Sequence, residues 1–255
     1  MTAPGALLSV VIPAFNEAAL LPVTLGRIRQ ALEEACDAPW EILVCDNGST
    51  DETASRAAEA GARVVHEPIR QIARARNAGA AAAEGAWLLF IDADAWPTPA
   101  LMAEVMALIR GGAHVGCGVT VRVEGGPLWN KLYTERLNPS MRLLKWSGGV
   151  FLLCRRDAFR AIGGFAEGLY AMEEIDFIAR LRWHAWRRGL SFAVLHRNPV
   201  VVQGRKGPFS LRLLARLFAS TVVALALFAL HVLSLGRLRI RGGRRLLSYW
   251  YGARR

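Results

Sequence analysis

The chain has 255 residues, of which 53% are hydrophobic and 21% charged, so it is long enough for one large α/β domain with a sizeable core. Its four cysteines show no Cys-x-x-Cys spacing, which excludes a disulfide framework or zinc site as the expected use and indicates reduced thiols in a cytosolic chain. Residues 1–176 hold 16 basic and 21 acidic side chains, whereas residues 177–255 hold 16 basic and no acidic ones, giving a net charge of +11. The C-terminal third is therefore suited to a negative partner: phosphate, nucleic acid or anionic lipid.

The first half of the sequence alternates between strand-like and helix-like segments. Apolar and β-branched runs predict strands at 7–15, 41–46, 62–66 and 87–92. Helical spacing of apolar residues predicts helices at 18–35, 51–60, 74–84 and 99–110. Strands that are apolar on both faces and alternate with helices predict an α/β fold with a mostly parallel sheet and helices on both faces.

The second half has a less regular pattern. Further strands are predicted at 114–123, 148–155 and 191–202. One helix is predicted over 128–144, and another follows the acidic residues at 173–176 and runs to about Arg188.

Residues 205–255 differ in composition from residues 1–204. The run Leu217–Gly236 has 20 uncharged residues, about the length that spans a bilayer, and arginines flank it on both sides. With a cytosolic domain, a single span would send the following arginines outside, against the positive-inside tendency. We therefore predict a domain over 1–204 and, over 205–255, a basic, apolar helix that lies in the membrane interface at the cytoplasmic face. A true span and an ordinary core helix are the alternatives, and nucleic acid is not expected because the basic residues flank an apolar helix.

Two carboxylates, Asp92 and Asp94, directly follow the predicted strand 87–92 and its apolar run. In parallel sheets ligands bind outside the carboxyl ends of the strands, and Asp46 also ends a strand. Oxygen ligands of this kind suit a hard cation such as Mg²⁺, which keeps room for substrate phosphates. The convergence predicts a metal–diphosphate site at this edge of the sheet.

Six motifs occur in order between Leu8 and Gly189. They are Val10–Glu17, Cys45–Thr53, Ala75–Gly79, Asp92–Asp94, Ser147–Gly149, and Gly163–Phe165 leading into Glu173-Glu174. In this order and spacing the chain resembles the family 2 glycosyltransferases, which have the GT-A fold. The resemblance implies an enzyme that moves a sugar from a nucleotide-diphosphate sugar to an acceptor hydroxyl with inversion at the anomeric carbon.

The resemblance also implies which residues bind the donor. Pro13, Ala14, Phe15 and Glu17 match the nucleotide-contacting segment, and Asp46 matches the residue that accepts a hydrogen bond from the base. Arg70 and Arg74 bring guanidinium groups near the diphosphate, where their planar geometry suits phosphate. The remaining donor-binding positions are Asp92, Gly148 and Gly149. Arg76 is interpreted as structural, because in the family the Arg-Asn pair mainly anchors its helix.

By the same resemblance, Asp94 together with Asp92 would hold Mg²⁺ or Mn²⁺ that bridges the two phosphates. The general base would be the second residue of the acidic pair, which makes Glu174 the candidate. The family usually has Asp at this position. Glu is one methylene longer than Asp, which leaves three alternatives. The acceptor pocket is adjusted to Glu174, Glu173 acts as the general base instead, or this copy of the enzyme is slow or inactive.

Other departures narrow the class. There is no Gln-x-x-Arg-Trp segment after the acidic pair, which favours a single-transfer enzyme over a processive synthase. Gln203 falls where many relatives place a histidine near the metal, and Arg205 and Lys206 could cover the phosphates instead. A lipid-linked acceptor would fit the predicted tail. Two other functions stay open: a non-catalytic relative that binds nucleotide sugar or lipid, and a nucleotidyltransferase, although Pro13–Glu17 is not the Gly-rich loop that the latter needs.

Overall fold

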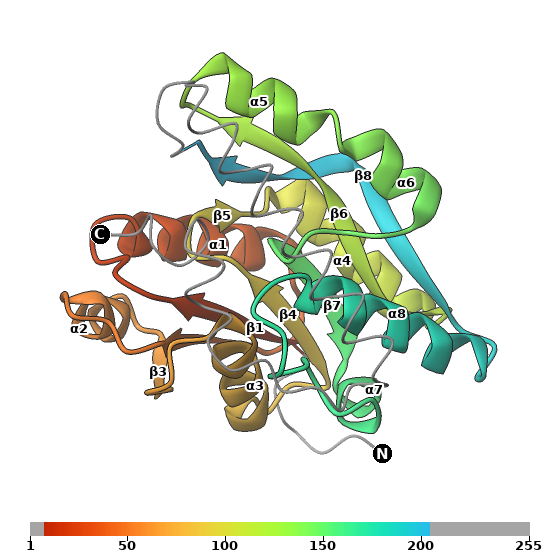
Figure 1. The fold of residues 1–255 in the computed structure, drawn as a ribbon, viewed down its shortest axis with the longest axis horizontal. Helices are drawn as coiled ribbons and strands as arrows, with labels where there is room; N and C mark the ends of the chain where they lie inside the picture. The colour runs from red at the N-terminus through yellow and green to blue at the C-terminus, as the bar shows by residue number, and fades with distance from the viewer. Residues whose placement is uncertain (1–7, 205–255) are drawn as a thin grey trace.

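The computed structural model describes residues 8–204, which form an α/β fold around one mixed sheet (Figure 1). The eight strands are β1 Leu8–Ala14, β2 Trp40–Asp46, β3 Arg63–His66, β4 Trp87–Ile91, β5 Ala95–Trp96, β6 His114–Glu124, β7 Phe151–Arg155 and β8 Ser191–Gln203. The eight helices are α1 Leu21–Ala35, α2 Thr53–Glu59, α3 Ile72–Ala82, α4 Pro99–Gly111, α5 Leu128–Glu135, α6 Asn138–Leu144, α7 Arg156–Ala161 and α8 Glu173–Trp186.

The predicted membrane-associating helix falls in residues 205–255, outside the described residues, so it stays a prediction together with the division at residue 204. Between Leu8 and Gly204, no helix has both the length and the hydropathy needed to cross a bilayer.

The sheet order is β3-β2-β1-β4-β7-β6-β8-β5. Strands β3, β2, β1 and β4 are parallel, as expected from the alternation of strands and helices. Beyond β4 the sheet is mixed, which the expectation of a mostly parallel sheet did not include: β6 and β8 are parallel, whereas β7 pairs antiparallel with both β4 and β6, and β5 pairs antiparallel with β8. A strand buried on both faces is apolar throughout in either direction, so its sequence does not reveal the direction of pairing.

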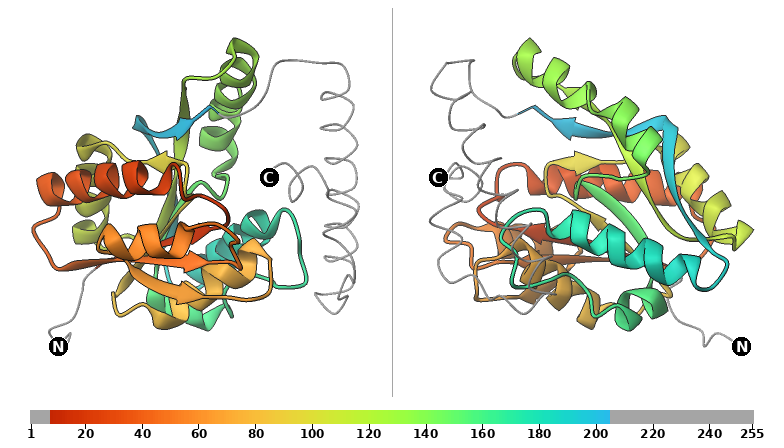
Figure 2. Two further views of the ribbon diagram at one scale, coloured as in Figure 1. Left: turned by 90° about the vertical axis from the view of Figure 1, so that its left-hand side faces the viewer. Right: turned by 45° about the vertical axis from the view of Figure 1, so that its right-hand side comes forward.

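Helices cover both faces of the sheet, as predicted (Figure 2). On one face α1, α2 and α4 pack through an aliphatic cluster that includes Leu25 and Met102. On the other face α3, α7 and α8 enclose the aromatic side chains of Phe90, Phe165 and Phe177. The rings of Phe165 and Phe177 are stacked with centroids 4.3 Å apart, which fastens the chain before α8 to the helix itself.

The single helix predicted over 128–144 is two helices in the structure. α5 ends at Glu135 and α6 begins at Asn138, directly before Pro139. Proline has no N–H to donate and its ring collides with the carbonyl four residues earlier, so a continuous helix breaks there. The Asn138 side chain bonds both the N–H and the carbonyl of Val121 at 2.9 and 2.8 Å, which holds the break against β6. The two-residue strand β5 and the helix α7 were not predicted.

Helix α3 approaches the sheet at a glycine. A Cβ atom at Gly79 would collide with the side chains of Val11 on β1 and Cys45 on β2. We expect Gly79→Ala to lower the free energy of unfolding by about 1–3 kcal/mol, measured by urea denaturation, because α3 must shift. Gly26→Ala in α1 is the matched control: nothing lies within 4 Å of its Cβ, so it should stabilise by about 0.5–1 kcal/mol. Equal effects of the two changes would contradict the close approach.

Candidate active site

The predicted nucleotide-contacting segment lies at the carboxyl ends of β1 and β2. Ala14 and Asp46 are paired across the two strands, and the Ala14 carbonyl accepts a hydrogen bond from the Asn47 N–H at 2.8 Å. The Asp46 carboxylate is buried, accepts from the Ser49 N–H at 3.1 Å and lies 3.4 Å from the His66 ring. Pro13, Ala14 and Asp46 are therefore brought together at one edge of the sheet.

Phe15 and Arg70 meet above this edge. The Arg70 guanidinium lies over the Phe15 ring, 3.5 Å from its centroid, so the segment after β3 contacts the segment after β1. Asn16 has a positive φ of 53°, and the Glu17 N–H donates to the Thr53 hydroxyl at 2.8 Å. A left-handed asparagine costs of the order of 1 kcal/mol, and it turns the chain sharply between Phe15 and Glu17.

Asp92 and Asp94 lie in the turn between β4 and β5, on either side of the buried Ala93. The Asp94 carbonyl accepts a hydrogen bond from the Gln203 N–H at 2.8 Å. The end of β8, at Gln203, therefore lies against the predicted metal ligand.

Arg76 of α3 joins this turn to the acidic pair. Its fully buried guanidinium donates to an Asp92 carboxylate oxygen at 3.1 Å, to a Glu173 oxygen at 2.9 Å and to the Gly149 carbonyl at 3.0 Å. Burial disfavours its charge, but the carboxylates of Asp92 and Glu173 outweigh that cost and raise the pKa of Arg76 further. One side chain thus connects its own sequence motif to three others of the six.

The acidic pair forms the first turn of α8. Glu173 is buried against Arg76, while Glu174 is half-buried. Burial and the neighbouring Glu173 raise the pKa of Glu174 to about 8, against the opposing effect of Arg76. A carboxylate with a pKa near the working pH is suited to accept a proton. Met172, the residue before the pair, has a positive φ of 61°, which sets the direction in which α8 begins.

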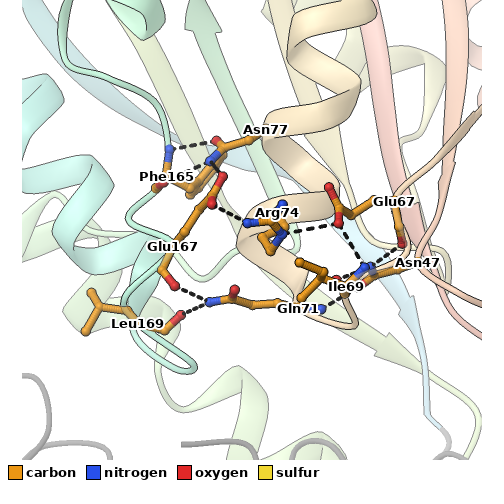
Figure 3. Close-up of polar contacts among 9 residues, drawn as sticks. All are labelled: Asn47, Glu67, Ile69, Gln71, Arg74, Asn77, Phe165, Glu167 and Leu169. Carbon is orange, nitrogen blue, oxygen red and sulfur yellow. Dashed lines mark hydrogen bonds and ion pairs between the residues drawn. The ribbon is translucent and has the colours of Figure 1, made fainter. Parts of the chain in front are cut away.

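Arg74 of α3 forms ion pairs with two carboxylates. Figure 3 shows its guanidinium between Glu67 and Glu167, at 3.2 and 2.7 Å. Its charge is therefore engaged by two carboxylates, and the predicted contact with a diphosphate stays untested. Arg74 instead connects the segment after β3 to the segment 165–169, which precedes the acidic pair.

The remaining contacts of this network go largely to main-chain atoms (Figure 3). The Gln71 amide donates to the carbonyls of Glu167 and Leu169 at 2.7 and 2.8 Å. The Asn77 side chain bonds both the N–H and the carbonyl of Phe165, at 2.9 and 3.0 Å. Sequence reasoning missed Gln71 and Glu167. The only signal was that the Arg76-Asn77 and Gly-Gly-Phe motifs both occur, which does not show that they touch.

The donor set fits a metal that is shared with a substrate. Among residues 8–204, no group of three or more His, Cys, Asp or Glu side chains could enclose a metal ion. Mg²⁺ commonly takes one or two carboxylates and completes its shell with substrate phosphates and water. Asp92 and Asp94 supply two hard oxygen donors at the strand end, which suits that mode of binding.

Comparison with known proteins decides the family. The family model "Glycosyl transferase family 2" matches residues 9–164, well over half of the chain. The chain belongs to this family. The matched region contains the strand-end carboxylates and ends at the Gly-Gly turn before the acidic pair.

Sequence relatives are transferases of the same kind. A glycosyltransferase of Haemophilus influenzae is 24% identical over 192 residues, which cover 69% of this chain and 62% of that protein. The N-acetylglucosaminyl-diphospho-decaprenol L-rhamnosyltransferase of Mycobacterium tuberculosis is 27% identical over 215 residues, which cover 64% of this chain and 67% of that protein.

Solved structures of family members have the same GT-A architecture. Glucosyl-3-phosphoglycerate synthase from Mycobacterium tuberculosis, in complex with Mn²⁺, UDP and glucosyl-3-phosphoglycerate, has a TM-score of 0.59 at 27% identity, with 88% of this chain and 78% of that one covered. A mannosyltransferase from Pyrobaculum calidifontis, in complex with GDP-Man and Mn²⁺, has a TM-score of 0.63 at 19% identity, with 98% and 70% covered, and supports the fold alone. The predicted GT-A fold is confirmed.

Proposed function

We propose that this protein transfers a sugar from a nucleoside diphosphate sugar to an acceptor hydroxyl, with inversion at the anomeric carbon. The observation that carries the proposal is the position of Arg76, which contacts both Asp92 at the end of β4 and Glu173 at the start of α8. The donor-binding edge and the candidate base therefore belong to one site. In a transfer reaction the donor and the acceptor must be adjacent, and this arrangement would place them so.

On the donor side, the ends of β1 and β2 hold the nucleoside. Asp46 accepts from the base, and the segment from Pro13 to Glu17 supplies main-chain contacts. Asp92 and Asp94 would hold Mg²⁺ or Mn²⁺, which when bound neutralises the charge that develops on the leaving diphosphate. The Mn²⁺ complex of the mycobacterial synthase supports this choice of metal.

On the acceptor side, Glu174 takes the proton of the attacking hydroxyl. The acceptor oxygen forms a bond to the anomeric carbon while the bond from that carbon to the diphosphate oxygen breaks, and attack on the opposite face inverts the configuration. Arg76 and Glu173 hold the first turn of α8 beside Asp92, so Glu174 is positioned relative to the donor. A raised pKa makes Glu174 a stronger base than an ordinary carboxylate.

We further propose that the acceptor is lipid-linked. The mycobacterial rhamnosyltransferase, whose name specifies a diphospho-decaprenol acceptor, supports this choice, as does the basic and apolar composition of residues 205–255. The family match speaks against a nucleotidyltransferase. A binding protein without transfer activity stays the second candidate, because Glu174 stands where the family usually has Asp.

Metal-dependent nucleotide release tests the proposal. Purified protein is incubated with UDP-, GDP- and dTDP-sugars, Mn²⁺ or Mg²⁺ and a membrane lipid extract, and free nucleotide is measured. We expect one donor to be turned over, and we expect Asp94→Asn to lower the rate by about 100-fold or more because the diphosphate charge is no longer neutralised. Chelation of the metal should have the same effect on the wild-type protein.

The matched control is Asp37→Asn, which removes an exposed carboxylate that pairs with the exposed Arg110 at 3.4 Å. This variant should release nucleotide at the wild-type rate. Donor binding that requires metal but gives no release with any donor would replace the transferase proposal with the binding-protein candidate. Release that is indifferent to metal and to Asp94→Asn would remove Asp94 from the site.

A further inference from the structure

The surface formed by α5, α6 and α8 carries large apolar side chains that the fold does not cover. Their exposed fractions lie between 50 and 83%, although most leucines of the described chain are buried. These side chains are Leu128, Leu132, Leu143, Leu144, Trp183 and Trp186. Clusters of this kind on a folded domain mark a binding surface.

Helix α8 is bonded to the end of α6, which directly follows α5 in the chain. The Arg182 guanidinium of α8 donates to the carbonyls of Leu144 and Lys145 at the end of α6, at 3.0 and 3.4 Å. The rings of Trp183 and Trp186 stack on each other with centroids 5.1 Å apart and face solvent. In the right-hand view of Figure 2, α6 lies directly above α8.

The charges on this surface have one sign. Lys131, Arg142, Lys145 and Arg182 are exposed among the apolar side chains. The one acidic residue of α5 and α6 is Glu135, which is turned toward the sheet and accepts from the Val123 N–H at 3.1 Å. After its first turn, α8 contains no acidic residue.

We infer that this surface docks on an anionic lipid bilayer. Leucines enter the acyl region, tryptophans favour the headgroup level, and lysines and arginines attract anionic headgroups. Two other occupants are disfavoured by charge repulsion. Residues 205–255 hold 11 basic and no acidic residues, so this basic surface would repel them. A second copy of the chain would bring two basic surfaces together.

The surface borders the candidate site. Glu174 lies in α8 two turns before Arg182, and the chain that leaves α6 passes through Gly149, whose carbonyl contacts Arg76. A bilayer on this surface would bring the hydroxyls of a lipid-linked acceptor toward Glu174. Delivery of an acceptor to Glu174 rests on the proposed function. Membrane docking itself can be measured without donor or acceptor.

A fluorescent label on the surface tests the docking. In the full chain carrying Cys36→Ser, Leu143→Cys is labelled with a polarity-sensitive fluorophore. The other three cysteines are fully buried, and burial raises their thiol pKa values, so they do not compete for the label. Ala58→Cys on α2, which packs on the opposite face of the sheet, is the matched control position.

We expect a blue shift at position 143, and none at position 58, on adding vesicles of phosphatidylcholine and phosphatidylglycerol. Vesicles of phosphatidylcholine alone should give a smaller shift. Adding Leu144→Glu should lower the vesicle partition coefficient by at least about tenfold, because an inserted leucine is replaced by a charge.

Three results would overturn the docking. Co-sedimentation with vesicles and no shift at position 143 would assign membrane attachment to another part of the chain. A blue-shifted label without vesicles, independent of protein concentration, would show that the chain covers its own surface. A shift that grows with protein concentration would indicate a second copy. Nucleotide release is not read in this assay, so failure of docking and failure of transfer are separate outcomes.

Discussion

Arg76→Met is expected to lower the free energy of unfolding by about 3–5 kcal/mol, because it leaves the buried Glu173 carboxylate without its cation. Glu173 stays enclosed by the fold, and Asp92 loses the guanidinium 3.1 Å away. Urea denaturation at neutral pH measures the loss. Nucleotide release should fall to background in the same variant, even at temperatures where it is folded, since α8 is no longer held beside Asp92.

Arg74→Met is the matched control. Arg74 also contacts two carboxylates, but its side chain is 30% exposed and Glu167 is 44% exposed, so its loss should cost about 1 kcal/mol or less. Combining Arg76→Met with Asp92→Asn and Glu173→Gln should recover part of the stability, because it removes the unpaired charges. It should recover none of the activity, because α8 is still not bonded to the turn at Asp92. Wild-type stability in the single Arg76→Met variant would refute the buried bridge.

Glu174→Gln is expected to lower nucleotide release by about 10²–10⁴-fold, the usual contribution of a general base, while donor binding stays unchanged. Donor binding is measured by calorimetry with metal, and the release rate by coupled assay. Glu174→Asp restores the residue that the family usually has and should keep more activity than Glu174→Gln. If Glu173 were the base, Glu174→Gln would be nearly as active as the wild-type protein.

The pH dependence provides a second measurement on Glu174. Its pKa rises from the ordinary value of 4.5 to about 8, so the ionised base, and with it the rate, should increase as pH approaches 8. Between pH 4.5 and about 8 the folded protein holds a proton that the unfolded chain has released, so Glu174 lowers stability as pH rises through this range. Glu174→Gln should therefore raise the melting temperature at pH 8 and leave it unchanged near pH 4. Equal shifts at both pH values would contradict a raised pKa.

The sequence was sufficient for the parallel half of the sheet because periodicity and strand-end residues are local signals. It placed Asp46, Asp92 and Asp94 at carboxyl ends, where the structure has them. The direction of β7 and the break at Pro139 were missed for different reasons. An apolar run is compatible with either strand direction, and a single proline interrupts a helix whose apolar spacing otherwise continues.

The contacts of the arginines could not be derived from their spacing. Arg74 and Arg76 are neighbours on α3, yet one faces Glu67 and Glu167 and the other enters the core to meet Asp92 and Glu173. Which carboxylate each guanidinium meets depends on how a segment 90 residues later packs on α3. Long-range pairs of this kind carry no local signature, although they determine how the site is assembled.

The path of the segment 165–169 is encoded outside the segment itself. Gln71 and Asn77 hold it by main-chain carbonyls and an N–H, which every residue type except a proline at position 165 would offer. Intervening positions such as Ala166 and Gly168 can therefore change without releasing the anchors. Acceptor preference could diversify by substitution there while the catalytic turn of α8 keeps its place, and the same positions are where an engineer would begin to redirect the enzyme.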